Sequence, residues 1–163
     1  MLFIRFLPHL FVALAAAGAL VACAAASTAT QDATSFQKVI LRDVTVLRGG
    51  RVVEVQSDGA VEVTIVAPGG KETHYAMQIS REKVAELANL LAEHHFNDIE
   101  IEFRAPVPDE ARPEIEVVWA TGESVVKAKW ANDVHPDFDA IYQWLLQLAE
   151  DAVKKGEEQG AGT

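Results

Sequence analysis

The amino-acid sequence predicts an α+β fold: a two-layer sandwich in which two helices cover one face of an antiparallel sheet. Two observations support this prediction. Short runs alternate apolar and polar residues and are separated by glycine-rich turns, which is typical of an antiparallel meander. Two longer segments repeat apolar residues at helical spacing, as amphipathic helices do. The expected order of elements is ββββ-α-βββ-α.

The first half of the expected domain contains four strands, which cover residues 40–48, 51–56, 60–67 and 71–79. Three turn sequences separate them: Gly49-Gly50, Ser57-Asp58-Gly59 and Pro68-Gly69-Gly70. Because a one-residue slip turns every side chain of a strand to the other face, matching the apolar faces sets the register of each hairpin. The expected cross-strand pairs are Val46 with Val53, Val44 with Val55, Val55 with Val61, Val53 with Val63, Ile65 with Thr73, Val63 with Tyr75 and Val61 with Met77.

This register gives the sheet one apolar face and one wet face. The apolar face is expected to contain Val44, Val46, Val53, Val55, Val61, Val63, Ile65, Tyr75 and Met77. The wet face is expected to contain Thr45, Glu54, Gln56, Glu62, Thr64 and His74. Arg42 interrupts the apolar face of the first strand, which predicts that this strand begins at a margin of the sheet.

The second half begins with a helix predicted over residues 81–95, for which Ser80 is the expected N-cap. Residues 98–103 alternate apolar and polar side chains, so they are expected to form a strand. The prolines within residues 104–113 predict an irregular segment, because proline lacks the backbone N–H that regular structure needs.

A second hairpin is expected from residues 114–121 and 124–131, joined by a two-residue turn at Gly122-Glu123. Its inner face is expected to contain Ile115, Val117, Trp119, Val126, Ala128 and Trp130. On the other face, Glu116 would meet Lys129 in an exposed ion pair.

The last element is a helix predicted over residues 137–155, which starts directly after Pro136. Its buried stripe is expected to contain Phe138, Ile141, Tyr142, Leu145, Leu148, Ala149 and Ala152. Lys154-Lys155 followed by Gly156 predicts the end of this helix.

The composition excludes several classes of function. The chain has 163 residues with 24 acidic and 14 basic side chains, which gives a formal net charge of −10. Nucleic acid is not expected as a partner, because binding to phosphates needs a basic face. The single cysteine, Cys23, allows neither an internal disulfide nor a cysteine-rich zinc site. No dinucleotide-binding, phosphate-loop, zinc-protease or serine-hydrolase motif occurs in the sequence, so we expect no cofactor and no enzymatic activity.

The N-terminal segment has the features of a secretory signal, since Arg5 is followed by an uncharged apolar stretch at residues 10–26. Within it, Leu20-Val21-Ala22-Cys23 resembles the lipobox of bacterial lipoproteins. The resemblance implies cleavage before Cys23 and lipid attachment to its sulfur and new amino group, so that acyl chains anchor the mature chain. Ala24 is not the aspartate that retains lipoproteins in the inner membrane, so the resemblance implies the outer membrane, facing the periplasm.

Two other interpretations of this segment remain open. One is ordinary secretion, with cleavage after residues 24–26, and the other is an uncleaved anchor, for which the uncharged stretch is short. The expected domain boundaries follow from the lipobox. Residues 1–22 are a signal peptide, 23–36 a flexible tether, 37–155 a single α+β domain and 156–163 a disordered tail.

Three groups of polar side chains are candidates for a site, and each has a simpler structural explanation. Adjacent helical residues point about 100° apart, so His94 and His95 are not expected to share a metal ion. Glu100, Glu102, Glu114 and Glu116 are expected on a wet sheet face, without the burial that separates the pKa values of catalytic carboxylates. His135 precedes Pro136 and is expected near the start of the last helix.

The remaining candidates form a hypothetical partner surface, which contains Trp144, Val118, Val125, Pro106 and Pro108. Trp144 lies at the edge of the last helix's apolar stripe and serves either as an anchor for a partner or as the margin of the core. Val118 and Val125 are expected on the outer face of the second hairpin, next to the proline-rich loop.

The predicted function is therefore a non-catalytic binding or envelope accessory domain on a membrane-tethered periplasmic lipoprotein. Its expected partners are the membrane, through the lipid, and another protein of the envelope; the sequence predicts no oligomeric state. An alternative is a secreted inhibitor or small-ligand-binding domain. A third hypothesis is a hydrolase whose motif is not recognised, built from the histidines and surface acids.

Overall fold

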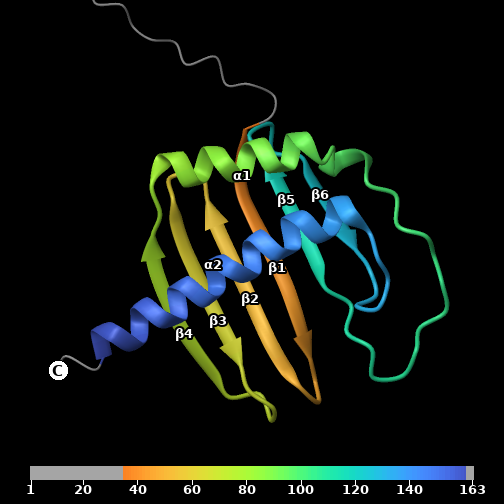
Figure 1. Ribbon diagram of the computed structural model, residues 1–163, viewed down its shortest axis with the longest axis horizontal. Helices are drawn as coiled ribbons and strands as arrows, with labels where there is room; N and C mark the ends of the chain where they lie inside the picture. The colour runs from red at the N-terminus through yellow and green to blue at the C-terminus, as the bar shows by residue number, and fades with distance from the viewer. Residues whose placement is uncertain (1–34, 161–163) are drawn as a thin grey trace, which may run out of the picture. The chain divides into compact units, whose positions relative to one another are not determined.

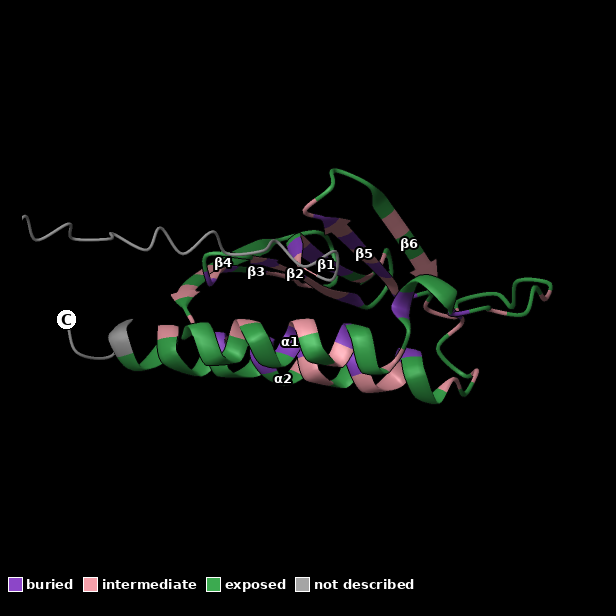
Figure 2. Cartoon of the chain, turned by 90° about the horizontal axis from the view of Figure 1, so that it is seen from above, coloured by how far each residue is buried: buried purple, intermediate pink, exposed green. Residues whose placement is uncertain are grey.

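The computed structural model describes residues 35–160, which form six strands, two α-helices and one short 3₁₀-helix. The strands make one antiparallel sheet in the order β4-β3-β2-β1-β5-β6. Both α-helices lie in front of the same face of the sheet (Figure 1), and the view from above shows them as a separate layer (Figure 2). The predicted α+β class is confirmed.

The elements are β1 (Phe36–Thr45), β2 (Gly49–Gln56), β3 (Ala60–Val66), β4 (Glu72–Gln78), α1 (Arg81–Glu93), the 3₁₀-helix η1 (Phe96–Asp98), β5 (Glu114–Trp119), β6 (Ser124–Ala128) and α2 (Pro136–Gly160). β1 lies inside the sheet, where it pairs with both β2 and β5.

β1 differs from the prediction in its register. Val39 pairs with Val55 and Leu41 with Val53, at the positions predicted for Val44 and Val46. Val39 and Leu41 are fully buried, whereas Val44 is 44% and Val46 93% exposed. The prediction that Val44 and Val46 belong to the apolar face was therefore wrong.

The two glycines explain this error, because they do not form the turn. The turn occupies residues 46–48, and Gly49 and Gly50 are the first residues of β2. A Cβ on Gly49 would lie 2.0 Å from the carbonyl oxygen of Val66, and one on Gly50 would lie 1.9 Å from that of Asp43. The glycines are therefore needed for the close approach of neighbouring strands.

The prediction that Arg42 marks a margin of the sheet was wrong. Arg42 lies where β1 faces β5, and its guanidinium group is 3.0 Å from Glu114 and 2.8 Å from Glu116. The two ion pairs lie on the face of the sheet away from the helices. Hydrogen bonds from Arg42 and from Ser124 lower the pKa of Glu116 below its ordinary value.

The next two hairpins have the predicted register. The confirmed pairs are Val55 with Val61, Val53 with Val63, Ile65 with Thr73, Val63 with Tyr75 and Val61 with Met77. Gly59 has the expected left-handed backbone, with φ at +89°. The predicted cap of α1 is also confirmed, since Ser80 Oγ accepts a hydrogen bond from the backbone N–H of Lys83.

Residues 98–103 do not form the predicted strand. η1 ends at Asp98, and the chain is irregular from there to Pro113. Phe96 and Ile99 are buried three residues apart, a spacing that the tight 3₁₀ turn brings to one side. Phe103, by contrast, is 96% exposed. The observed order is therefore ββββ-α-ββ-α, with one strand fewer than predicted.

The β5–β6 hairpin also departs from its predicted register. Val117 pairs with Val125 instead of Ala128, because the turn is longer than Gly122-Glu123 alone. The shift is odd, so it reverses the faces of β6: Val125 and Lys127 point to the helix side, and Val126 and Ala128 point away. Glu116 consequently lies opposite Val126 and does not meet Lys129.

α2 continues to Gly160, beyond the predicted end at Lys155 and into the predicted tail. Gly156 lies inside the helix, where a Cβ would be 2.5 Å from the ring of Tyr75. The glycine therefore permits contact with β4 and does not end the helix. Nearer the start of α2, the hydroxyl of Tyr142 donates to Asp43 at 2.6 Å, and burial together with this bond raises the pKa of Tyr142 above its ordinary value.

The hydrophobic core lies between the helices and the sheet. Its fully buried members include Val39, Leu41, Val53, Val55, Leu87, Ile115, Val117, Phe138, Ile141 and Leu145. Within residues 35–160, neither helix is apolar enough over a sufficient length to span a bilayer.

The β1 register predicts a sharp contrast between two apolar substitutions. Leu41→Ala should lower the free energy of unfolding by about 2–5 kcal/mol, because it opens a cavity in the core. Val46→Ala should change it by no more than about 0.5 kcal/mol, because the side chain is exposed. Urea denaturation of the purified variants measures both values. A larger loss for Val46→Ala than for Leu41→Ala would restore the register predicted from the sequence.

Candidate binding groove at the β6 edge

β6 is an edge strand, and its hydrogen-bonding pattern shows which backbone groups are unpaired. The backbone N–H of Trp119 donates to Glu123 at 2.8 Å, that of Lys129 to Pro113 at 3.2 Å and that of Ala131 to Ala111 at 2.9 Å. In an antiparallel pair such bonds recur at every second residue. The odd-numbered residues of β6 therefore bond to β5, and the even-numbered ones direct their N–H and C=O groups outward. In the part of the chain that the structure describes, the outward groups of Val126 and Ala128 have no partner.

Two lysines on the helix side of this hairpin attach other segments to it. Lys127 Nζ donates to the carbonyl oxygens of Asn97 at 2.8 Å and Ile99 at 2.7 Å. Lys129, only 4% exposed, donates to the carbonyl oxygen of Asp133 at 2.6 Å and forms an ion pair with Asp139 at 3.0 Å. The first lysine holds η1 and the residue after it, and the second holds the start of α2.

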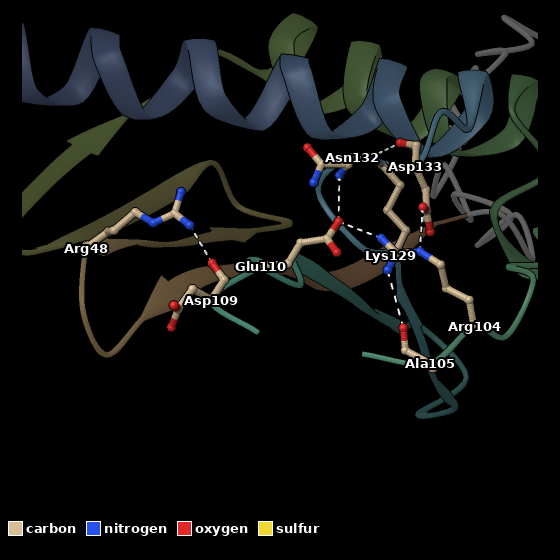
Figure 3. Close-up of polar contacts among 8 residues, drawn as sticks. All are labelled: Arg48, Arg104, Ala105, Asp109, Glu110, Lys129, Asn132 and Asp133. Carbon is tan, nitrogen blue, oxygen red and sulfur yellow. Dashed lines mark hydrogen bonds and ion pairs between the residues drawn. The ribbon is translucent and has the colours of Figure 1, made fainter. Parts of the chain in front are cut away.

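The irregular segment after Ile99 is tied down by Arg104 (Figure 3). Its guanidinium group contacts Glu110 at 2.5 Å and Asp133 at 2.8 Å, and Glu110 also accepts from the backbone N–H of Asn132 at 3.0 Å. The hydrogen bond from Arg104 lowers the pKa of Glu110, and the bonds to Glu110 and Asp133 raise the pKa of Arg104. Two further bonds, from Arg104 to the Ala105 carbonyl and from Arg48 to the Asp109 carbonyl, hold the backbone of this loop.

Trp130 lies next to the ion pairs of Arg104, and two arginines approach its ring. The guanidinium carbon of Arg104 is 5.3 Å from the centre of the indole ring, and that of Arg112 is 5.6 Å away. Arg104 is already paired with carboxylates, whereas Arg112 is exposed and makes no hydrogen bond or ion pair within residues 35–160. The Arg112 guanidinium group is therefore an exposed cation beside the indole ring, without a carboxylate partner among the described residues.

A groove of ≈ 440 Å³ lies between β6 and the irregular segment. One wall consists of β6 and the residues after it: Val126, Lys127, Ala128 and Trp130. The other wall and the ends consist of Ile99, Ile101, Glu102, Phe103, Arg104, Pro106 and Arg112. Phe103 and Val126 are 96% and 49% exposed, so apolar surface remains open to solvent on both sides of the groove. Figure 1 shows this segment passing outside the β6 edge of the sheet.

Of the predicted partner-surface residues, only Pro106 lines this groove. Pro108 is exposed in the same loop, and Val118 lies on the outer face of β5 next to Lys38 of β1. The placement of Val125 on the outer face was wrong, because it packs against the core on the helix side.

Trp144 occupies the margin of the core. Its ring packs against the core cluster, and its Nε1 donates to Glu86 at 2.7 Å. Lys83 Nζ lies 5.9 Å from the ring centre. The indole N–H is thus already satisfied within the domain. Cys23, the predicted lipid-attachment residue, lies outside the described residues.

His94, His95 and His135 lie near the start of α2, whereas His74 lies in β4. His94 Nδ1 is 2.9 Å from Asp137 Oδ1, and this hydrogen bond lowers the pKa of Asp137. His135 Nδ1 accepts weakly from the backbone N–H of Phe138 at 3.4 Å, as a residue near a helix start does. Within residues 35–160, no three His, Cys, Asp or Glu side chains are arranged to hold a metal ion.

Sequence reasoning missed most of the groove. Trp130 was predicted on the inner face, and Phe103 was assigned to a strand that does not form. Lys129 was expected in an exposed ion pair with Glu116, yet it is buried against α2. The sequence does contain one sign of this arrangement. Lys127 and Lys129 are two residues apart in the predicted strand, so both must lie on the same face of the sheet.

Comparison with known proteins adds no assignment. The chain matches no family model, and none of the curated proteins is significantly similar to it. The fold and the site together define an α+β domain with an open groove along an unpaired edge strand.

The ion pairs of Arg104 with Glu110 and Asp133 predict how residues 101–109 respond to substitution and to pH. Arg104→Met should make cleavage of residues 101–109 by subtilisin several-fold faster at neutral pH, while Arg112→Met, which removes a cation from the same indole but no ion pair, should leave the rate unchanged. Limited proteolysis with mass spectrometry measures both. Because the pKa of Glu110 is lowered, the ion pair with Arg104 stabilises the loop fully above pH 4.5, the ordinary pKa of a glutamate. This stabilisation is lost as the pH falls through the lowered pKa. Equal cleavage of the two variants would contradict this role.

Proposed function

We propose that this chain is a lipid-anchored binding module of the bacterial cell envelope, attached through Cys23, and that its partner binds in the groove beside β6. The observation that carries the binding function is the groove itself. It combines an unpaired strand edge with exposed apolar side chains, Phe103 and Val126, and with cations at its border. Exposed apolar surface rimmed by polar groups is a mark of interaction sites.

The anchor and the groove fit together as parts of one protein. The lipobox at residues 20–23 supports attachment to a membrane, and among the described residues the first strand begins at Phe36. The residues between them would give the domain room to meet a partner near the membrane surface. The location that we propose is the periplasmic side of the outer membrane, because Ala24 follows the cysteine.

A second candidate function is the binding of a small molecule. The groove volume of ≈ 440 Å³ is within the range of small-ligand sites, and its lining mixes apolar side chains with a few charged ones. The experiment below separates the two functions, because only a protein partner gives a crosslinked product large enough to shift the chain on an immunoblot.

The binding function predicts position-dependent crosslinking in cells. The photoreactive residue p-benzoylphenylalanine at Phe103 should form a discrete product with one partner, because this side chain is exposed at the groove. The matched control is the same residue at Val46, which is 93% exposed but lies in the β1–β2 turn. Immunoblotting detects the products, and mass spectrometry identifies them. Identical products from both positions, or none from Phe103, would contradict a protein-binding groove.

The anchor is tested in the same cells. Growth with an alkyne analogue of palmitate should label the wild-type chain, and Cys23→Ser should abolish the label and release the chain from the membrane fraction. An unlabelled wild-type chain would remove the lipid anchor from the proposal. The binding groove would then be proposed for a secreted protein without a lipid anchor.

A further inference from the structure

The groove has one wall that is a strand edge, and this determines the kind of partner that fits. Val126 and Ala128 direct backbone donors and acceptors into it, as the hydrogen bonds of the odd-numbered residues require. An extended chain satisfies such groups by pairing with the edge as an additional strand. The segment containing Ile101 and Phe103 forms the opposite wall, so the space is bounded on both sides and suits one extended segment rather than a second sheet.

The charges at the groove indicate the chemistry of that segment. Arg104 is compensated by Glu110 and Asp133, so its charge is not available. Arg112 has no carboxylate partner within residues 35–160, and Lys127 bonds only to carbonyl oxygens. Glu102 is the one carboxylate among the lining residues. The groove is thus locally positive on a chain whose net charge is −10.

We infer that the groove binds an extended acidic peptide segment of the partner by strand addition to β6. This inference rests on the proposed binding function and specifies its mode. Along the added strand, side chains alternate between the two faces of the sheet. Those on the outer face lie next to Val126 and Ala128 and are apolar, and those on the helix face lie next to Lys127 and are acidic. Arg112 holds a further carboxylate at the Trp130 end.

A second copy of this chain fits the groove less well. β6 of another copy carries no carboxylate between Ser124 and Ala128, and it would bring its own Lys127 to the same edge. Like charges brought together in this way oppose pairing. Self-association through β6 is therefore an outcome that the experiment must detect, not the occupant that we infer.

The test uses the full chain, purified in detergent, and a fluorescent, N-acetylated, C-amidated octapeptide of alternating Val and Glu. Fluorescence anisotropy should show saturable binding of this probe and none of the corresponding Val–Lys octapeptide. Val126→Pro should weaken binding about tenfold, because it removes an outward N–H, and an edge strand tolerates proline there. Val126→Ala, the matched control, loses the same apolar side chain but keeps the N–H, so it should bind at least about threefold more tightly than Val126→Pro.

Arg112→Glu provides a second variant that does not depend on the tolerance of β6 for proline. The side chain is exposed and makes no hydrogen bond or ion pair within residues 35–160, so the fold should be unchanged while probe binding weakens about tenfold. The same variant should gain measurable affinity for the Val–Lys octapeptide, a reversal that unfolding does not produce.

Three results would overturn the inference. They are failure of the Val–Glu octapeptide to bind, equal binding by Val126→Pro and Val126→Ala, and a wild-type dimer that Val126→Pro converts to a monomer in analytical ultracentrifugation. The last result assigns the edge to a second copy. The crosslink from Phe103 is independent of all three: if it persists while the octapeptide fails, the groove still binds a protein and only the mode is wrong.

Discussion

The buried ammonium group of Lys129 determines how the second half of the domain is assembled. Counted over whole residues, Lys129 is the one buried charged residue in the described part of the chain, with 4% of its surface exposed. The side chain of Glu110 is as well enclosed, at 3%. A charge in this position is stable only when it is paired and hydrogen-bonded. Asp139 at 3.0 Å, the carbonyl oxygen of Asp133 at 2.6 Å and the ring of Phe138 at 5.8 Å supply that environment. All three belong to the start of α2 or to the turn before it, so the lysine joins the end of the sheet to the helix layer.

The groove is a consequence of this arrangement. With Lys129 on the helix side, Lys127 also faces the helices and binds the carbonyl oxygens of Asn97 within η1 and Ile99 after it. Trp130 then lies on the opposite face, where Arg104 and Arg112 contact it. The segment between Ile99 and Arg104 is therefore held at both ends but passes outside β6 without pairing with it. An unpaired edge with a wall in front of it is what supports the proposed binding of an extended partner.

The parts of the fold that the sequence predicts well are those with a single consistent solution. Between β2 and β4, the short turns and the alternating valines allow only one register in which Val55 meets Val61 and Val63 meets Tyr75. The predicted end of α2 was wrong because a glycine at position 156 fits either a helix end or a close contact inside a helix. Only the position of Tyr75 across the interface shows that Gly156 permits packing. Gly49-Gly50 is ambiguous in the same way. Close approach between strands is a tertiary property that a local turn signal does not contain.

The candidate site was predicted poorly for a related physical reason. Assigning β6 by hydrophobicity alone puts Val126, Ala128 and Trp130 inside and both lysines outside, because it has no means of finding the acceptors at Asp139, Asn97 and Ile99. These acceptors come from segments far apart in the sequence. Phe103 shows a different error. Apolar and polar residues alternate over residues 98–103 and predict a strand, yet this segment does not pair with the edge of β6 beside it. Both errors conceal the feature to which we assign the function.

The groove depends on a register in which the odd-numbered residues of β6 bond to β5 and the even-numbered ones form a free edge. Amide hydrogen exchange followed by NMR on the full chain tests this register. Slow exchange is expected for Val125, Lys127 and Lys129, and fast exchange for Val126 and Ala128 in the absence of a partner. Fast exchange at Lys127 together with protection at Val126 would contradict the register, the burial of Lys129 and the groove that depends on both.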